Sequence, residues 1–296
     1  MLTEAVQFEE RSIISLKKRL ISKDGTEKFI WQTFDNHSFE TVLVYLQYRR
    51  IPRVICVSSQ IGCPVKCRFC TTGTSFVRNL TDIEIIQQVT DVLKYKNDEW
   101  AKEKCPSFEI SFMSMGEPFL NWSNVRNALY FFDHKFGANI EMTISTVGIA
   151  PRIYELGSES FSCNVDLQIS LHAVNPKVRE NLIPNCIYKV EEIIEAAECY
   201  SEISRRKVCI NYLLLKDIND GKTDCQNLIK ILDTKHFYVK LSQLNGQENT
   251  YFPADVKSAK MFESLLRSAG FETKMFKSYG TDINAGCGQL PSGLHT

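Results

Sequence analysis

Short runs of β-branched and aromatic residues alternate along most of the chain with longer segments whose apolar residues recur every three or four positions. The short runs predict strands, and the longer segments predict amphipathic helices. Because strands that alternate with helices favour a parallel sheet with right-handed crossovers, the pattern predicts an α/β fold, a partial (β/α)6 barrel. The six predicted barrel strands are residues 53–57, 108–113, 140–145, 165–171, 208–214 and 239–244.

The helix after the first barrel strand has a clear start. Thr81 is followed three residues later by Glu84, which is the spacing of a capping box, and apolar residues then recur at helical spacing. Further helices are predicted at residues 190–204 and 257–269. We expect the apolar face of the first helix to pack on the sheet, and the functional site to lie at the carboxyl ends of the strands.

The first 50 residues have a different pattern. A turn at residues 22–26 separates two predicted strands, 12–20 and 29–34, and a third strand is predicted at 41–46. We interpret residues 1–50 as a small N-terminal β extension and residues 51–296 as the barrel with its C-terminal segment. No linker rich in proline and glycine separates the two, so an independently folded N-terminal domain is not expected.

Composition narrows the class of protein. The 296 residues are 44% hydrophobic, which is enough for one large core. No apolar stretch approaches the ~20 residues of a membrane span, and the N-terminus lacks a signal peptide's basic and apolar regions, so a cytoplasmic location with reduced thiols is expected. The 35 basic and 35 acidic residues balance, and the short basic runs at 17–19, 49–53 and 205–207 are candidates for phosphate contact but are more typical of solvated surface.

Three cysteines carry the strongest chemical signal. Cys63, Cys67 and Cys70 have C-x3-C-x2-C spacing just after the first predicted barrel strand. Three thiolates leave a zinc site one ligand short, whereas a four-iron, four-sulfur cluster held in this way keeps one iron open for a substrate or cofactor. A zinc knuckle or chance clustering is the alternative, but no further ligand pair follows nearby. With Phe69 before the last cysteine, the run resembles the signature of radical S-adenosylmethionine (SAM) enzymes.

Further motifs along the chain resemble the RlmN/Cfr family of radical SAM methyltransferases. They are C-V-S-S-Q-I-G-C at 56–63, R-N-L-T at 78–81, M-G-E-P at 115–118, I-S-T-V-G at 144–148, S-L-H-A at 170–173, L-L-K-D-I-N-D at 214–220 and G-T-D-I-N-A-G-C-G-Q-L at 280–290. The resemblance runs from about residue 9 to residue 290. It implies a radical SAM barrel that holds a [4Fe–4S] cluster on Cys63, Cys67 and Cys70, with SAM at the open iron.

The resemblance also implies a set of SAM-binding residues just past the ends of four predicted strands. Each has a simpler explanation by itself, because a glycine permits a tight turn, a serine satisfies backbone groups, and a lone histidine is usually structural. Their shared position, where such sheets bind ligands, favours the functional interpretation. The set comprises Gly116, Glu117, Ser145, Ser170, Leu171, His172 and Asn245.

Cys287 is the second chemically informative position. It lies between Gly286 and Gly288, whose conformational freedom allows its sulfur to reach a ligand, although a buried packing cysteine is the alternative. By the resemblance, Cys287 receives a methyl group from one SAM molecule. A radical from a second SAM molecule then removes a hydrogen atom from that group, and the resulting methylene radical adds to an electron-poor adenine carbon.

Two more residues acquire roles from the resemblance. Cys56 resolves the covalent link to the substrate by forming a transient disulfide with Cys287, whereas from the residues alone it equally fits an inward position on a buried strand. Glu40 corresponds to the suggested proton acceptor, and the alternative is a solvated carboxylate on an edge strand.

The leading hypothesis is therefore a radical SAM methyltransferase that modifies C2 or C8 of an adenine in ribosomal or transfer RNA. Family members that act on ribosomal RNA usually carry a further N-terminal helical domain, and this chain begins at the β extension, which weakens the expectation of a large folded RNA. A small metabolite or natural-product intermediate is the alternative substrate. A non-catalytic, redox-sensing iron–sulfur protein is the alternative class, which the presence of both Cys56 and Cys287 disfavours. The expected partners are a flavodoxin or ferredoxin as electron donor and a thiol reductant.

Overall fold

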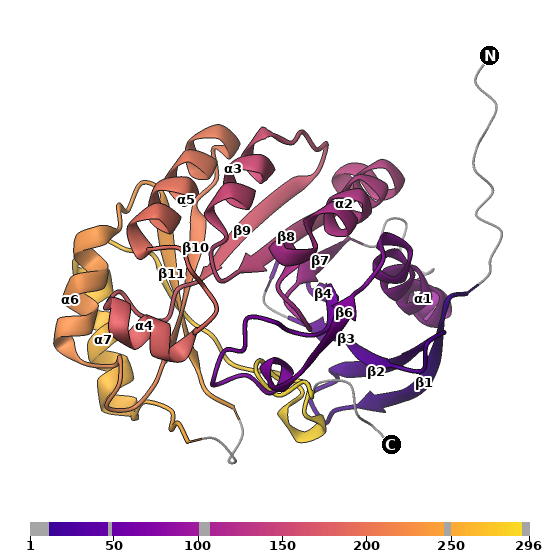
Figure 1. Ribbon diagram of the computed structural model, residues 1–296, viewed down its shortest axis with the longest axis horizontal. Coiled ribbons are helices and arrows are strands. Elements are labelled where there is room, and N and C mark those ends of the chain that lie inside the picture. Colours follow the sequence, from indigo (N-terminus) through magenta and orange to yellow (C-terminus); the bar gives the residue numbers. More distant parts are fainter. Residues whose placement is uncertain (1–11, 47–48, 101–106, 246–249, 292–296) are drawn as a thin grey trace.

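Ten strands form one continuous mixed sheet (Figure 1). The computed structural model describes residues 12–46, 49–100, 107–245 and 250–291. From β4 onward the neighbouring strands run parallel, in the order β4, β7, β8, β9, β10, β11, β12. They are β4 (Arg53–Cys56), β7 (Phe108–Phe112), β8 (Ile140–Thr146), β9 (Asn164–Ser170), β10 (Val208–Leu214), β11 (Phe237–Gln243) and β12 (Thr273–Met275).

The six predicted barrel strands are confirmed, each with its ends within two residues of the prediction. The seventh parallel strand, β12, was not predicted, and neither was the separate hairpin of β5 (Gln60–Gly62) and β6 (Phe76–Asn79). Each of these is only three or four residues long, which is too short to display a period along the chain. The sheet keeps two edges, at β1 and β12, so the predicted partial barrel is confirmed.

Helices connect the parallel strands, and α2, α3 and α5 lie along the outside of the sheet in Figure 1. The helices are α1 (Asp82–Trp100), α2 (Trp122–Phe136), α3 (Ala150–Ser158), α4 (Pro176–Leu182), α5 (Val190–Ser204), α6 (Lys222–Ile231) and α7 (Val256–Ser268). The capping box of α1 is confirmed, because the Thr81 N–H donates to the Glu84 carboxylate at 2.8 Å and the Glu84 N–H donates to Thr81 Oγ1 at 3.2 Å. No helix within the described ranges is long and apolar enough to cross a membrane.

The N-terminal strands continue the same sheet in antiparallel fashion. They are β1 (Ile14–Ile21), β2 (Glu27–Thr33) and β3 (Ser38–Tyr45), which confirms the three strands predicted in this region. β3 pairs with β4, with Val42 opposite Cys56. The predicted boundary near residue 50 therefore falls between two hydrogen-bonded strands, and β3 is an interior strand rather than an edge.

The two faces of the parallel strands differ in polarity. On the outer face, Ile110 and Ile144 are completely buried in the main hydrophobic core. Their neighbours along the strands, Ser111 and Ser145, line an internal cavity instead. Because successive residues of a strand point to opposite faces, this alternation places an apolar layer beneath the helices and a polar layer inside the barrel.

Candidate active site

A cavity of about 620 Å³ lies inside the barrel. Its wall combines inner-face residues of the strands, the loop with the three cysteines and the C-terminal segment after β12. The residues predicted from the sequence that belong to the wall are Cys56, Cys70, Ser145, Ser170, His172 and Cys287. The predicted residues that are not part of the wall are Glu40, Cys63, Cys67, Gly116, Glu117, Leu171 and Asn245.

The loop with the three cysteines is anchored by the β5–β6 hairpin. The Cys63 N–H donates to the Ser75 carbonyl at 2.9 Å, and the Cys70 N–H donates to the Cys67 carbonyl at 3.1 Å. Gly62 has a φ of 75°, and a Cβ atom there would lie 2.1 Å from the Ser75 carbonyl oxygen. The start of the loop therefore requires glycine at position 62.

Two thiols of this loop, those of Cys63 and Cys67, are in an unfavourable setting for bare thiolates. Burial raises the pKa of Cys63 to about 12. Burial also raises the pKa of Cys67, and the nearby thiols of Cys70 and Cys63 raise it further. A bound cation would stabilise the thiolate forms of Cys63 and Cys67.

Gly116 and Glu117 form a tight connection after β7. Gly116 has a φ of 103°, and a Cβ atom there would lie 2.7 Å from Ser59 Oγ. The buried Glu117 carboxylate accepts hydrogen bonds from the Phe119 N–H at 3.0 Å and the Val147 N–H at 2.8 Å. Burial raises the pKa of Glu117 to about 7 despite these bonds. The carboxylate therefore needs a further cationic or donor group to stay fully ionised at neutral pH.

His172 is held in one orientation at the cavity wall. Its backbone has a left-handed φ of 62°, and its Nδ1 atom accepts a hydrogen bond from the Leu213 N–H at 3.0 Å. The ring meets Phe69 edge to face, with centroids 5.0 Å apart. Burial lowers the pKa of His172 to about 3, and the positive charges of Arg179 and Lys240 lower it further. The imidazole is therefore neutral and carries its proton on Nε2.

Gln168 connects the polar groups of the inner face. Its amide donates to Ser145 Oγ at 2.9 Å, and its Oε1 atom accepts a hydrogen bond from the Lys240 ammonium. Lys240 also lies over the ring of Phe276, 4.9 Å from its centroid. Both Lys240 and Phe276 line the cavity. This part of the wall thus presents a cation, a hydroxyl and an aromatic ring to any ligand.

The segment with Cys287 lies between the cysteine loop and the sixth barrel strand. Thr71 donates to the Gly288 carbonyl through both its N–H at 3.0 Å and its Oγ1 at 2.5 Å. Thr72 Oγ1 donates to the Leu290 carbonyl at 2.8 Å. On the other side, Asn245 Nδ2 donates to the Cys287 carbonyl at 3.1 Å. Asn245 therefore orients the Cys287 backbone.

Cys56 and Cys287 face the same cavity although they are far apart in sequence. Cys287 is exposed to the cavity space, and the surrounding protein atoms still raise its pKa through desolvation, an effect that the Lys240 ammonium partly offsets. Burial also raises the pKa of Cys56, and the Cys287 thiolate raises it further. The two thiols therefore share one cavity wall, and both have raised pKa values.

Glu40 is buried rather than solvated, so the alternative of a solvated edge-strand carboxylate is wrong. Its Oε1 atom lies 3.2 Å from the ammonium of Lys28, which is also buried. The reason is that β3 has neighbours on both sides, β2 and β4. The sequence did not reveal Lys28, because its partner lies on a different strand.

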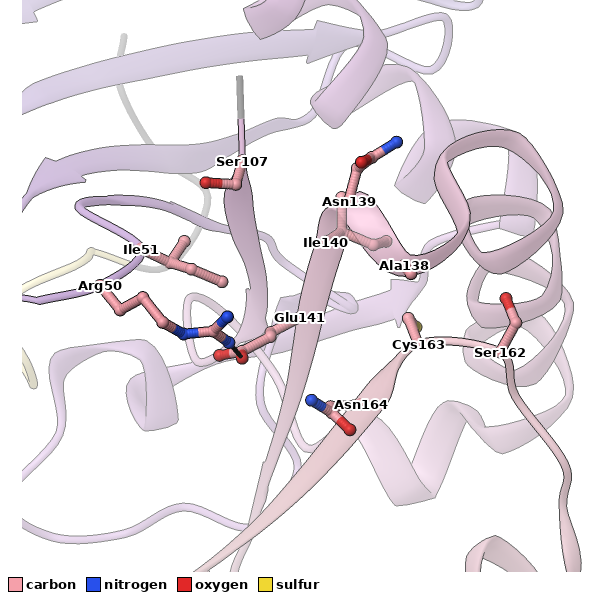
Figure 2. Close-up of a pocket in the computed structure, with 10 residues that line it drawn as sticks. All are labelled: Arg50, Ile51, Ser107, Ala138, Asn139, Ile140, Glu141, Ser162, Cys163 and Asn164. Carbon is pink, nitrogen blue, oxygen red and sulfur yellow. Dashed lines mark hydrogen bonds and ion pairs between the residues drawn. The ribbon is translucent and has the colours of Figure 1, made fainter. Parts of the chain in front are cut away.

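A second, smaller cavity of about 320 Å³ lies near the amino ends of β8 and β9. Figure 2 shows the side chains of Arg50 and Glu141 pointing toward one another there, and they form an ion pair. Its wall contains none of the residues predicted as site residues.

Sequence reasoning missed the cavity residue Lys240 and the buried Arg179 near the site. Lys240 carries no motif, but its position two residues after Tyr238 and two before Ser242 is the inward alternation of β11. Arg179 on α4 is buried and donates to the Val147 carbonyl at 2.5 Å. Nothing in the local pattern distinguishes Arg179 from the exposed Lys177 on the same short helix.

Comparison with known proteins agrees with this geometry. The model of the radical SAM superfamily matches residues 57–224. The dual-specificity RNA methyltransferase RlmN of Nautilia profundicola is 39% identical over 284 residues, which cover 91% of this chain and 78% of the relative. The chain belongs to the RlmN family of radical SAM methyltransferases.

Other members of the RlmN family and a solved structure agree. A probable RlmN from Thermotoga petrophila is 37% identical over 280 residues, covering 93% of this chain and 78% of the relative. The crystal structure of a radical SAM methyltransferase from Sphaerobacter thermophilus superposes with a TM-score of 0.86 at 32% identity, covering 95% of this chain and 82% of the other.

The RlmN family uses a [4Fe–4S] cluster and SAM, and the residues of this chain fit that cluster. Among the described residues, no three His, Cys, Asp or Glu side chains surround the position of a single metal ion. A cluster makes a different demand, because each thiolate binds a different iron atom. Cys63, Cys67 and Cys70 offer three thiols from one loop, and Cys70 lines the same cavity as Cys287, which is consistent with that demand.

Proposed function

We propose that this chain methylates C2 or C8 of an adenine in RNA, with Cys287 as the carrier of the methyl group. One observation carries the proposal: Cys56 and Cys287 line one cavity together with Cys70 of the three-cysteine loop. A redox-sensing protein has no need for two further thiols at that place. The names of the relatives, which are RNA methyltransferases, support RNA over a free metabolite.

The cofactors are assigned to residues as follows in this proposal. When bound, the cluster and SAM supply the methyl group, one electron and the radical that activates the methyl group. Cys63, Cys67 and Cys70 hold the cluster. The SAM-binding set is Gly116, Glu117, Ser145, Ser170, Leu171, His172 and Asn245. The partly protonated Glu117 carboxylate, whose pKa burial raises, supports this assignment because a ligand ammonium would restore its charge.

The remaining chemistry belongs to the cysteines. Cys287 holds the activated carbon as a thioether and joins it to the adenine ring. The ring adduct then loses its proton and one electron, which the cluster would accept. The Cys56 thiolate attacks the Cys287 sulfur, so that a disulfide forms while the bond from sulfur to the transferred carbon breaks, and that carbon takes up a proton to become the methyl group. Bridging requires Cα atoms within about 7 Å, and the position of both cysteines in the wall of one cavity supports their proximity.

The proton and the electrons need acceptors and donors. We assign the ring proton to Glu40, whose side chain lies on the same face of β3 as the cavity residues Val42 and Val44. A thiol reductant resets the disulfide of Cys56 and Cys287, and a flavodoxin or ferredoxin supplies the electron. Cys287 cannot accept a second methyl group until the disulfide is reduced.

The proposal is tested by trapping the substrate. In Cys56→Ala the link between Cys287 and the adenine cannot be resolved, so mass spectrometry of the reaction with SAM, reductant and total RNA should find a nucleotide attached to the peptide that contains Cys287. The mass of the adduct identifies the acceptor, because RNA yields a nucleotide after nuclease treatment and a metabolite yields its own mass.

Cys209→Ala is the matched control, because Cys209 is a buried cysteine that lines the same cavity. This variant should release methylated product as the unaltered chain does. The double variant Cys56→Ala with Cys287→Ala should give no adduct. Retention of methyl transfer by Cys287→Ala alone would contradict the carrier mechanism.

A further inference from the structure

Alternate residues at the turn between β1 and β2 face the segment that carries Cys287. Ser22, Asp24 and Thr26 lie in the turn itself, and Lys28 follows on β2. All four meet residues 280–284, whose compact turn η4 (Thr281–Ile283) is closed by a hydrogen bond from the Ala285 N–H to the Gly280 carbonyl at 2.9 Å. Figure 1 shows this yellow segment near the indigo β1 and β2.

Two carboxylates join the turn to the segment: Asp24 belongs to the turn, and Asp282 belongs to the segment. The Asp24 Oδ2 atom accepts a hydrogen bond from the Gly280 N–H at 2.8 Å. Asp282 returns the contact, because its carboxylate accepts hydrogen bonds from the Ser22 hydroxyl and, at 3.2 Å, from the Lys23 N–H. Charged acceptors of backbone N–H groups make the stronger class of hydrogen bond.

Lys28 completes the contact from inside the protein. Its ammonium is buried, lies 3.2 Å from Glu40 Oε1, and donates to the Asn284 carbonyl at 3.2 Å. A buried ammonium is tolerated only where it is paired and hydrogen-bonded. Lys28 therefore ties the Asn284 backbone, three residues before Cys287, to the interior of the N-terminal strands.

Gly280 allows the two parts to approach closely. Its φ is 65°, and a Cβ atom there would lie 2.7 Å from Thr26 Cγ2. The backbone at Gly280 therefore packs directly against Thr26, so the contact does not depend on long side chains alone. On its opposite side the segment is bound by Thr71, Thr72 and Asn245, so the N-terminal turn supplies the other half of its support.

We propose that Ser22, Asp24, Thr26 and Lys28 form a brace that fixes the position of Cys287 in the cavity. In these terms the N-terminal extension is a positioning element of the active site. The proposal rests on the function proposed for Cys287. Lys28 is a positioning residue and not a catalytic one, because it acts through the Asn284 carbonyl and Glu40.

The test compares Lys28→Met with Lys18→Met, since Lys18 is an exposed lysine of the same hairpin. Anaerobic holoenzyme, reconstituted with the cluster, is treated with iodoacetamide, and the alkylation of unmethylated Cys287 is followed by peptide mass spectrometry. Loss of the brace should raise the alkylation rate and the amide exchange of residues 280–290 severalfold. The kcat for methyl transfer should fall about tenfold or more at an unchanged KM for SAM, because small misplacement of a reacting group is costly.

Two further variants test the same brace independently of Lys28→Met. Lys28→Arg should recover part of the lost rate, and Asp24→Ala should reproduce the faster alkylation if Lys28→Met does not fold. Lys18→Met should behave as the unaltered chain does. Wild-type alkylation and exchange in folded Lys28→Met and Asp24→Ala would overturn the brace. These readouts do not depend on methyl transfer, whereas turnover by Cys287→Ala would overturn the proposed function alone.

Discussion

The outer and inner faces of the parallel sheet are built from the same strands and have opposite compositions. Ile144 and Leu241 on the outer face are at most 1% exposed, whereas their sequence neighbours Ser145 and Lys240 line the cavity. The sequences of parallel strands that are covered on both faces are usually continuous apolar runs. Alternation in a parallel sheet therefore indicates an interior that must accept a polar ligand. The outer face is expected to determine stability, and the inner face chemistry.

The strongest test of this division is Ile144→Ala on the outer face of β8. Removing this completely buried side chain from the core should lower the free energy of unfolding by about 2–5 kcal/mol. Methyl transfer per folded molecule should remain unchanged. Urea unfolding followed by circular dichroism gives the first quantity, and turnover normalised to cluster content gives the second. A loss of turnover in the folded fraction would break the division.

The matched substitution on the inner face is the neighbouring Ser145→Ala. Only the hydrogen bond from the Gln168 amide at 2.9 Å is lost, so stability should change by no more than about 1.5 kcal/mol. Because we assign Ser145 to the SAM site, the Kd for SAM should rise about tenfold, which corresponds to about 1.4 kcal/mol. Equilibrium dialysis with the holoenzyme measures this. An unchanged Kd would remove Ser145 from the proposed site.

The smallest expected effect follows from replacing Lys240, the lysine on the inner face of β11. Burial raises the pKa of Cys287, and Lys240 opposes that rise. Lys240→Met should therefore raise the thiol pKa further, so that less thiolate is present at a given pH and the pH profile of Cys287 alkylation moves to higher pH. Alkylation at neutral pH should slow severalfold. Lys277→Met is the control, because Lys277 lines the cavity without affecting the pKa of Cys287. Equal profiles for both variants would contradict the role of Lys240.

Local signals were sufficient for the elements and for much of the site. The Thr81 and Glu84 pair predicted the start of α1, and the spacing of three cysteines predicted a metal-binding loop, because each signal lies within a few residues. The motif resemblance also selected Cys56 and Cys287, which line one cavity.

Contacts between distant segments could not be predicted in the same way. Lys28 and Asn284 are 256 residues apart, and nothing around either residue indicates the other. The burial of Glu40 likewise depends on β3 pairing with β4, which places an apparently peripheral strand inside the sheet. Short strands such as β12 form by pairing with a neighbouring strand. Three residues are too few to show a hydrophobic pattern in the sequence.

The bonds from Thr71 to Gly288 also have a consequence for how the protein is made. Synthesis proceeds from the N-terminus, and these partners are 217 residues apart. A chain interrupted before residue 280 would contain all three cysteines of the loop and most of the strands. The loop would keep its bonds to Ser75 and Leu182 but would lack those to Gly288 and Leu290. The cavity wall is therefore completed only by the last residues to be synthesised.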